Sequence, residues 1–212
     1  EIWNNVFMQY FKDKDGKFSP LQKKNVDTGM GLERALRIVN GVETVYDTPL
    51  FAGIIGKVEE LSGKHYADDK KSFRIISDHL RAATFLLADG VVPARMGGGY
   101  ILRRLIRRAN RYMSRLGIEG VHMQEVAEVV VREYSQAYPE LNQNKDTIYS
   151  QITAEEEKFH STLNKGLRRF DEMVANQGDR KVLDGEAVFH LYDTFGFPIE
   201  LTKELAAEKG FE

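Results

Sequence analysis

The sequence predicts a mainly α-helical protein with a small antiparallel β-sheet at its start. An apolar and aromatic run from Ile2 to Phe11 is followed by the turn signal Asp15-Gly16, and a second extended segment ends near Val26. From residue 31 onward, apolar residues recur at helical spacing between helix stop signals. We therefore expect two parts, residues 1–41 with the sheet and residues 42–212 with helices only.

The segment Asp27–Arg34, inside the first part, reads Asp-Thr-Gly-Met-Gly-Leu-Glu-Arg. It follows the second extended segment and precedes a helical stretch that stops at Asn40-Gly41. The order is therefore strand, glycine-rich turn, helix. Glycines without a Cβ let a backbone pass close to a bound group, although a short Gly-x-Gly is by itself a weak signal.

The helical part is divided by glycine and proline signals. Thr48 is a candidate cap for a helix that starts at Pro49, because proline is favoured in the first helical position. Ile148, Ile152 and Phe159 belong to an apolar stripe that predicts one long helix, in which Gly166 marks a bend or close packing. The predicted helices span about 49–61, 71–87, 99–116, 123–137, 145–174, 184–193 and 198–209.

Composition excludes several classes of protein. The 212 residues are 42% hydrophobic and 29% charged, as in soluble proteins. The chain has no cysteine, which excludes disulfides and thiolate metal sites and fits a cytoplasmic setting. No apolar run is as long as a membrane span, and no signal peptide is visible, so no membrane partner is expected. Because the chain opens on Glu1 inside a predicted strand, we expect a fragment whose natural start lies upstream.

Charge is distributed unevenly along the chain. The net charge is −2, yet residues 95–115 contain seven arginines and no acidic residue. At about 100° per residue, the six arginines from 103 to 115 share one helix face and the apolar residues take the opposite face. We expect two or three of these arginines to pair with carboxylates and the face as a whole to meet an RNA backbone. A solvated charged face is the alternative.

Several stretches together resemble the alanyl-tRNA synthetases. In that family, the segment from Val26 to Arg34 matches motif 3 of the class II catalytic fold. The resemblance implies the last part of a class II catalytic domain followed by a helical domain that recognises the tRNA acceptor stem. The remaining matching stretches are 1–10, 77–82, 88–91, 99–109 and 191–198.

The resemblance also implies a function. The parent enzyme would activate alanine with ATP and Mg²⁺ and transfer it to the 3′ end of tRNA(Ala). Motifs 1 and 2, the editing domain and the oligomerisation domain of the family lie outside these residues, so we expect the fragment to be inactive alone. The alternative is a helical RNA-binding module that no longer binds nucleotide. A DNA-binding helix-turn-helix is disfavoured because the arginines spread over the whole helix face.

Substrate residues follow by resemblance. Asn4, Val6 and Asp27 match the alanine pocket, where a carboxylate pairs with the ammonium group. The ATP-binding residues implied are Gly29, Gly31 and Arg34, the last offering a planar charged fork. The alternative is that Asp27 caps a turn and Arg34 is a surface residue. No catalytic residue is predicted.

The tRNA contacts follow in the same way. The family reads a G·U pair with an asparagine and an aspartate. Asp193 matches the aspartate, but Arg95 stands where the family has asparagine, and arginine donates hydrogen bonds without accepting any. The glycines at 97–99 either let the loop approach RNA or make it flexible. The predicted tRNA-binding residues are Arg95, Arg103, Arg104, Arg107, Arg108, Arg111 and Asp193.

The five histidines do not form a zinc motif, and without cysteine we expect no zinc in this fragment. His79, among apolar neighbours, is predicted to be a hydrogen-bonded structural residue. Tyr192 and Phe195 can stack on a base, but core packing is the favoured role.

Overall fold

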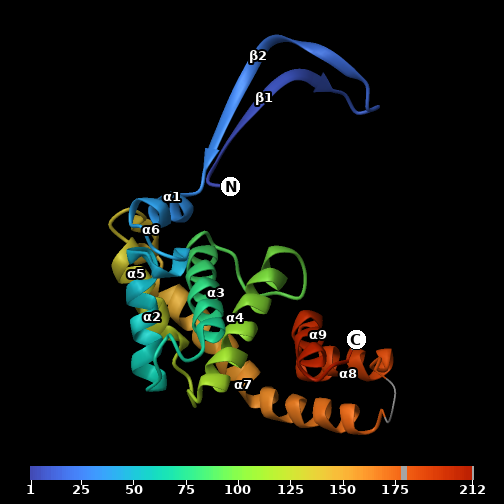
Figure 1. The fold of residues 1–212 in the computed structure, drawn as a ribbon. Coiled ribbons are helices and arrows are strands. Elements are labelled where there is room, and N and C mark those ends of the chain that lie inside the picture. The colour runs from blue at the N-terminus through green and yellow to red at the C-terminus, as the bar shows by residue number, and fades with distance from the viewer. Residues whose placement is uncertain (178–180, 212) are drawn as a thin grey trace. The chain divides into compact units, whose positions relative to one another are not determined.

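A computed structural model describes residues 1–177 and 181–211 of the chain and divides it into two compact units, 1–52 and 53–212 (Figure 1). The predicted fold class is confirmed, because the described residues contain one two-stranded antiparallel sheet and are otherwise mainly helical.

The first unit is a hairpin followed by short helices. Strand β1 (Trp3–Lys12) pairs with β2 (Phe18–Met30), and the turn between them contains Gly16 with a positive φ of 82°. Helix α1 (Leu32–Val39) and the 3₁₀ turn η1 (Val45–Asp47) follow. Both strands are exposed almost throughout.

The glycine-rich segment differs from the prediction. Strand β2 continues to Met30, and Gly29 pairs with Asn4 across the hairpin. The prediction of a turn at Asp27–Gly31 was therefore wrong for most of the segment. Backbone pairing with β1 keeps these residues extended, and the change of direction occurs only at Gly31, the N-cap of α1.

The boundary between the units lies inside α2 (Pro49–Ser62), later than the expected boundary at residue 41. Residues after α1 still belong to the first unit, where the rings of Tyr46 and Phe51 lie 4.8 Å apart. The side chain of Thr48 donates to the carbonyl of Val45, 2.6 Å away.

In its described residues, the second unit contains helices joined by loops. The predicted helices are present, with ends close to those predicted, and one further short helix, α6, was missed because Pro139 was taken as a stop. The unit begins with the part of α2 from Gly53 to Ser62. The helices that follow are α3 (Lys70–Ala88), α4 (Gly97–Leu116), α5 (Met123–Tyr134), α6 (Pro139–Gln143), α7 (Lys145–Ala175), α8 (Gly185–Phe195) and α9 (Ile199–Glu208).

Two groups of buried side chains hold this unit together. Helix α3 packs on α4 and α5, and α7 packs on all three. The second group joins the C-terminal half of α7 to α8 and α9 through Phe170, Leu191 and Leu201. Figure 1 shows α8 and α9 beside the far end of α7. Among the described residues, no helix is both long and apolar enough to cross a membrane.

Candidate nucleic-acid interface

Helix α4 buries its apolar face as predicted. Leu102, Ile106 and Ala109 are fully buried, and Gly117 ends the helix with a positive φ of 87°. One residue differs, because Ile101, expected on the core side, is 47% exposed. The apolar stripe therefore fixes which way the arginines point.

The arginine face of α4 is not a row of free cations. We expected two or three arginines to be paired, and that prediction was wrong, because all six from Arg103 to Arg115 lie within 4.0 Å of a carboxylate. Most of the partners lie far along the chain, on α7 and α9, and Arg115 also lies 3.5 Å from Asp69 at the N-cap of α3. The pairs are Arg103 and Arg107 with Glu155, Arg104 with Glu200, Arg108 with Glu204, and Arg111 and Arg115 with Glu208.

Arg107 is almost completely buried. Its side chain is 3% exposed, and its Nε donates to Glu155 Oε1 at 2.6 Å. It also donates to the carbonyl of Gly196 and lies over the ring of Phe159, 5.0 Å from the centroid. Burial lowers the pKa of the guanidinium, and the charge of Glu155 opposes that change. The expectation that Arg107 faces RNA is corrected, because a buried, paired guanidinium cannot meet a phosphate.

The loop before α4 folds back on the start of that helix. Gly99 is buried, and a Cβ there would lie 2.4 Å from the carbonyl oxygen of Val92 and 2.6 Å from the Cβ of Ala94. The amide of Ala94 donates to the carbonyl of Gly99 at 3.1 Å. This glycine is therefore needed for close packing, and the packed loop presents the exposed Arg95 beside the first turns of α4.

The loop, the helix and the end of α8 enclose a pocket of about 110 Å³. Arg95 and Asp193, far apart in the sequence, both line it. Helix α8 ends at Gly196, whose φ of 66° is left-handed, so the chain turns sharply after Asp193. The other lining residues are Tyr100, Arg103, Arg104, Arg107, Tyr192, Gly196 and Pro198.

The pocket is positively charged and has two aromatic walls. Four arginines and one carboxylate line it. Burial raises the pKa of Tyr100, and the charge of Glu200, which accepts from the Tyr100 hydroxyl at 3.3 Å, raises it further. Tyr192 is 36% exposed, so it is not the core residue that was favoured. Arginine donors, tyrosine rings and one acceptor form a surface suited to the bases and phosphates of RNA.

The first unit brings its predicted substrate residues onto one face. Val6 pairs with Asp27, and Asn4 pairs with Gly29. Because paired residues share a face and alternate residues return to it, Asn4, Val6 and Asp27 lie on the same side of the hairpin. This register places a carboxylate, an amide and a small apolar side chain together, as an amino acid substrate requires.

Arg34 lies on the first turn of α1, and its Nη1 donates to the carbonyl of Glu1 at 2.9 Å. Together with Arg37 it lines an open pocket of about 850 Å³ in the same unit, which Glu1, Ile2, Glu43, Thr44 and Val45 complete. Two permanent cations fit the phosphates of a nucleotide. The carbons nearest to a Cβ built at Gly31 belong to Arg34, at 3.3 Å, so this glycine lets the Arg34 side chain lie against the backbone.

No protein metal cluster appears in the described part of the chain, where no group of three or more His, Asp or Glu side chains is placed to hold an ion. His79 is hydrogen-bonded as predicted: its Nδ1 lies 3.0 Å from Asp78 and its Nε2 lies 2.8 Å from Arg108 Nη1. Its role in this structure is to support the arginine.

Comparison with known proteins agrees with the resemblance. A family model described as class II tRNA synthetases (A) matches residues 1–212. The chain belongs to the class II tRNA synthetases. It is 49% identical over 217 residues to the alanine–tRNA ligase of Borreliella afzelii (strain PKo), covering 100% of this chain and 36% of that protein.

Two further relatives carry the same name. The alanine–tRNA ligase of Treponema pallidum (strain Nichols) is 45% identical over 218 residues, with 99% of this chain and 36% of that protein covered. The protein of that name from Thermotoga maritima is 45% identical over 215 residues, covering 100% of this chain and 25% of that protein. The chain therefore spans about a third or a quarter of the length of these relatives.

Sequence reasoning missed two groups of residues in this region, one in the pocket and one on α9. Tyr100 and Gly196 belong to the pocket, and the glutamates of α9 hold the arginines. The spacing of Glu200, Glu204 and Glu208 by four residues was a usable signal, because it puts three carboxylates on one helix face.

Proposed function

We propose that this chain is part of an alanine–tRNA ligase of the cytoplasm, supplying motif 3 and the surface that binds the acceptor stem of tRNA(Ala). The parent enzyme activates alanine with ATP, and Mg²⁺ accompanies the nucleotide. It then transfers the alanyl group to the 3′ end of the tRNA. By itself the chain does not activate alanine, and the oligomer contacts of the parent lie outside it.

The pocket shared by Arg95 and Asp193 is the observation that carries this proposal. Asp193 accepts a hydrogen bond from a base edge in the acceptor stem. Arg95 donates, so it favours an acceptor such as a carbonyl oxygen of a base or a phosphate. Tyr192 and Tyr100 supply flat surfaces beside them.

Phosphate contacts come from the arginines at the mouth of the pocket, Arg103 and Arg104. The side chain of Arg104 is 35% exposed, although it is paired with Glu200 at 2.7 Å. Phosphate contacts add affinity that depends on salt but little discrimination between bases. For Arg108 and Arg111, which Glu204 and Glu208 engage, tRNA contact stays a prediction.

In the first unit, the face of the hairpin that carries Asn4, Val6 and Asp27 binds alanine. Asp27 pairs with the ammonium group, Val6 contacts the methyl group, and Asn4 hydrogen-bonds to the carboxylate. Gly29, Gly31 and Arg34 bind ATP. The alanine carboxylate attacks the α-phosphorus of ATP, which forms the alanyl adenylate and releases pyrophosphate. The residues of this chain position the reactants and stabilise charge, without a covalent intermediate on the protein.

Binding of acceptor-stem minihelices tests the proposal. RNAs with G·U or G·C at the recognition position are titrated at two salt concentrations. We expect the wild-type chain to distinguish them, and Asp193→Ala to lose the distinction while keeping the dependence on salt. Arg104→Gln should weaken both RNAs alike and reduce the slope of log K against log salt by about 1.

The matched control is Arg132→Gln on α5, which removes the same charge from a side chain that is 68% exposed. It should leave both RNAs nearly unaffected. Equal binding of the two RNAs by the wild-type chain would contradict base reading at the pocket. Equal losses from all three substitutions would contradict the division between base and phosphate contacts.

A further inference from the structure

Helix α9 has two faces that contact different neighbours. Leu201, Leu205 and Ala206 are buried in the apolar group formed with α7 and α8. The acidic side chains Glu200, Glu204 and Glu208 recur every four residues and lie on another face. Among the described residues, the apolar group around α9 contains no side chain of α4.

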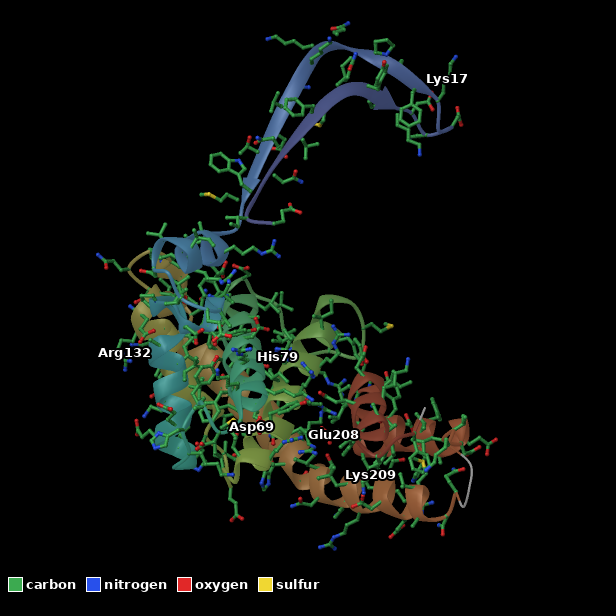
Figure 2. All side chains as sticks on the ribbon, in the orientation of Figure 1. Lys17, Asp69, His79, Arg132, Glu208 and Lys209 are labelled. Atoms are coloured by element: carbon green, nitrogen blue, oxygen red, sulfur yellow. The ribbon has the colours of Figure 1, made fainter. Side chains whose placement is uncertain are left out.

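Ion pairs link α9 to α4, together with hydrogen bonds from the hydroxyls of Tyr100 and Tyr112. Glu200 lies 2.7 Å from Arg104, Glu204 lies 3.1 Å from Arg108, and Glu208 lies 3.0 Å from Arg115. The pairs follow one another in the same order along both helices. Arg115 lies within 4.0 Å of two carboxylates, those of Glu208 and of Asp69, which is the N-cap of α3. Figure 2 labels both acidic residues.

Glu204 is the most firmly held of the three. Arg108 donates to both of its oxygens at 3.1 Å, and Tyr112 donates to it through the hydroxyl. Lys71 approaches within 3.4 Å. Burial alone would raise the pKa of the Glu204 carboxyl, but these hydrogen bonds and charges outweigh it and lower the pKa to about 2. The carboxylate therefore stays charged in neutral solution.

Asp193 lies on α8, the helix that precedes α9. The turn between α8 and α9 is held by Arg107, which donates to the carbonyl of Gly196. Any movement of α9 away from α4 acts on the same turn. The position of Asp193 in the pocket that Arg95 also lines thus depends on how α9 is held.

We propose that Glu200, Glu204 and Glu208 are positioning residues for RNA discrimination, which hold α9 on the arginine face of α4 and thereby keep Asp193 in the pocket that Arg95 also lines. The inference rests on the proposed function for its RNA readout. In this proposal Arg108, Arg111 and Arg115 hold α9 in place through their ion pairs and do not contact phosphate. Arg104 serves both, since it lines the pocket and pairs with Glu200.

A competing interpretation predicts a different effect of Glu204→Gln on RNA binding. If the arginines bind phosphate and the glutamates only compete with RNA, Glu204→Gln frees Arg108 and tightens binding to every RNA. If the glutamates position Asp193, Glu204→Gln lowers the preference for one base pair over the other. Arg108→Gln then has the same effect, because either change removes the same link.

The experiment compares G·U and G·C minihelices with the 212-residue chain. We expect Glu204→Gln and Arg108→Gln each to reduce discrimination on the order of tenfold, with the salt slope kept. The double variant should lose little more than either single one. Glu208→Gln, farther from the pocket, should reduce discrimination less. It replaces Glu204→Gln in the experiment if that variant does not fold. Glu172→Gln on α7 removes the same charge from an exposed pair with Arg169 and should change nothing.

A second measurement needs no RNA. Because the chain has no cysteine, spin labels at Val92→Cys and Phe189→Cys, both exposed positions, are unique. We expect Glu204→Gln to broaden the distance distribution between them and Glu172→Gln to leave it narrow. An unchanged distribution, or tighter binding of both RNAs with discrimination intact, would overturn the positioning role. If the wild-type chain fails to discriminate while the distribution still broadens, the proposed function fails and the holding role of the glutamates stands.

Discussion

Gly166 shows how much one residue depends on its neighbours. It lies in the interior of α7, where glycine is unfavourable by itself. A Cβ at this position would lie 2.2 Å from the ring of Phe197, which is fully buried beside the turn that follows Asp193. Of the two roles considered from the sequence, bend or close packing, the contact supports close packing.

We expect Gly166→Ala to destabilise the chain by about 1–3 kcal/mol, because the added methyl group displaces Phe197. Gly56 in α2 is the matched control, since a Cβ there meets nothing within 4 Å. Gly56→Ala should instead stabilise by about 0.5–1 kcal/mol, through helix propensity alone. Urea unfolding monitored by circular dichroism measures both. Changes of the same sign in the two variants would argue against close packing at Gly166.

At the scale of elements, helices in this protein are tied together by buried carboxylates. Glu155 and Glu156 are neighbours on α7, and both are buried. Glu155 pairs with Arg107, whereas Glu156 accepts from the backbone amides of His122 and Met123, each at 3.0 Å. A side chain of α7 thus satisfies the free amides at the start of α5.

The charge state of Glu156 predicts a dependence of stability on pH. Burial raises its pKa from 4.5 to about 7, although the two amide hydrogen bonds act to lower it. Between these values the folded state holds a proton that the unfolded state has lost, so stability falls as the pH rises from about 4.5 to about 7. We expect Glu156→Gln, which cannot ionise, to remove about 1–3 kcal/mol of that decline.

Urea midpoints at about pH 5 and about pH 8 check this prediction. The readout is the difference between the two midpoints, since the substitution also changes stability at each pH. Glu172→Gln, on the exposed part of the same helix, should keep the wild-type difference. An equal difference in wild type and Glu156→Gln would show that this carboxyl stays ionised throughout.

For the whole molecule, the two candidate sites belong to different units. The residues proposed to bind alanine and nucleotide lie on an exposed hairpin and α1, while the pocket proposed to bind RNA belongs to the helical unit. Catalysis by preorganised charge requires a site from which water is largely excluded. The exposed face that carries Val6 and Asp27 does not provide such a site by itself.

We therefore expect the 212-residue chain to show no exchange of pyrophosphate into ATP in the presence of alanine above the background without enzyme. The full-length alanine–tRNA ligase of Thermotoga maritima is the positive control in the same assay. Clear turnover by the chain alone would contradict this expectation. It would mean that the hairpin and α1 suffice to activate the amino acid.

The sequence by itself determined the local structure and the family. Apolar spacing and stop signals gave helix ends close to those observed, because burial of one face and capping are local properties. The order of motifs identified the class II synthetases, and hairpin pairing then placed Asn4, Val6 and Asp27 on one face. The end of β2 was missed because pairing with β1, a partner more than twenty positions earlier, outweighs the local turn signal of two glycines.

Only the tertiary structure decided what the arginines of α4 do. Their helix face was predictable, but their partners on α7 and α9 were not, since no local pattern says which distant carboxylate will meet which guanidinium. The same holds for the pocket that Arg95 and Asp193 both line, where Gly99 lets the preceding loop pack on α4 and Gly196 leaves room for the side chain of Arg107. Helix periodicity reaches over a few residues, whereas ion pairing and close packing depend on the position of the whole chain.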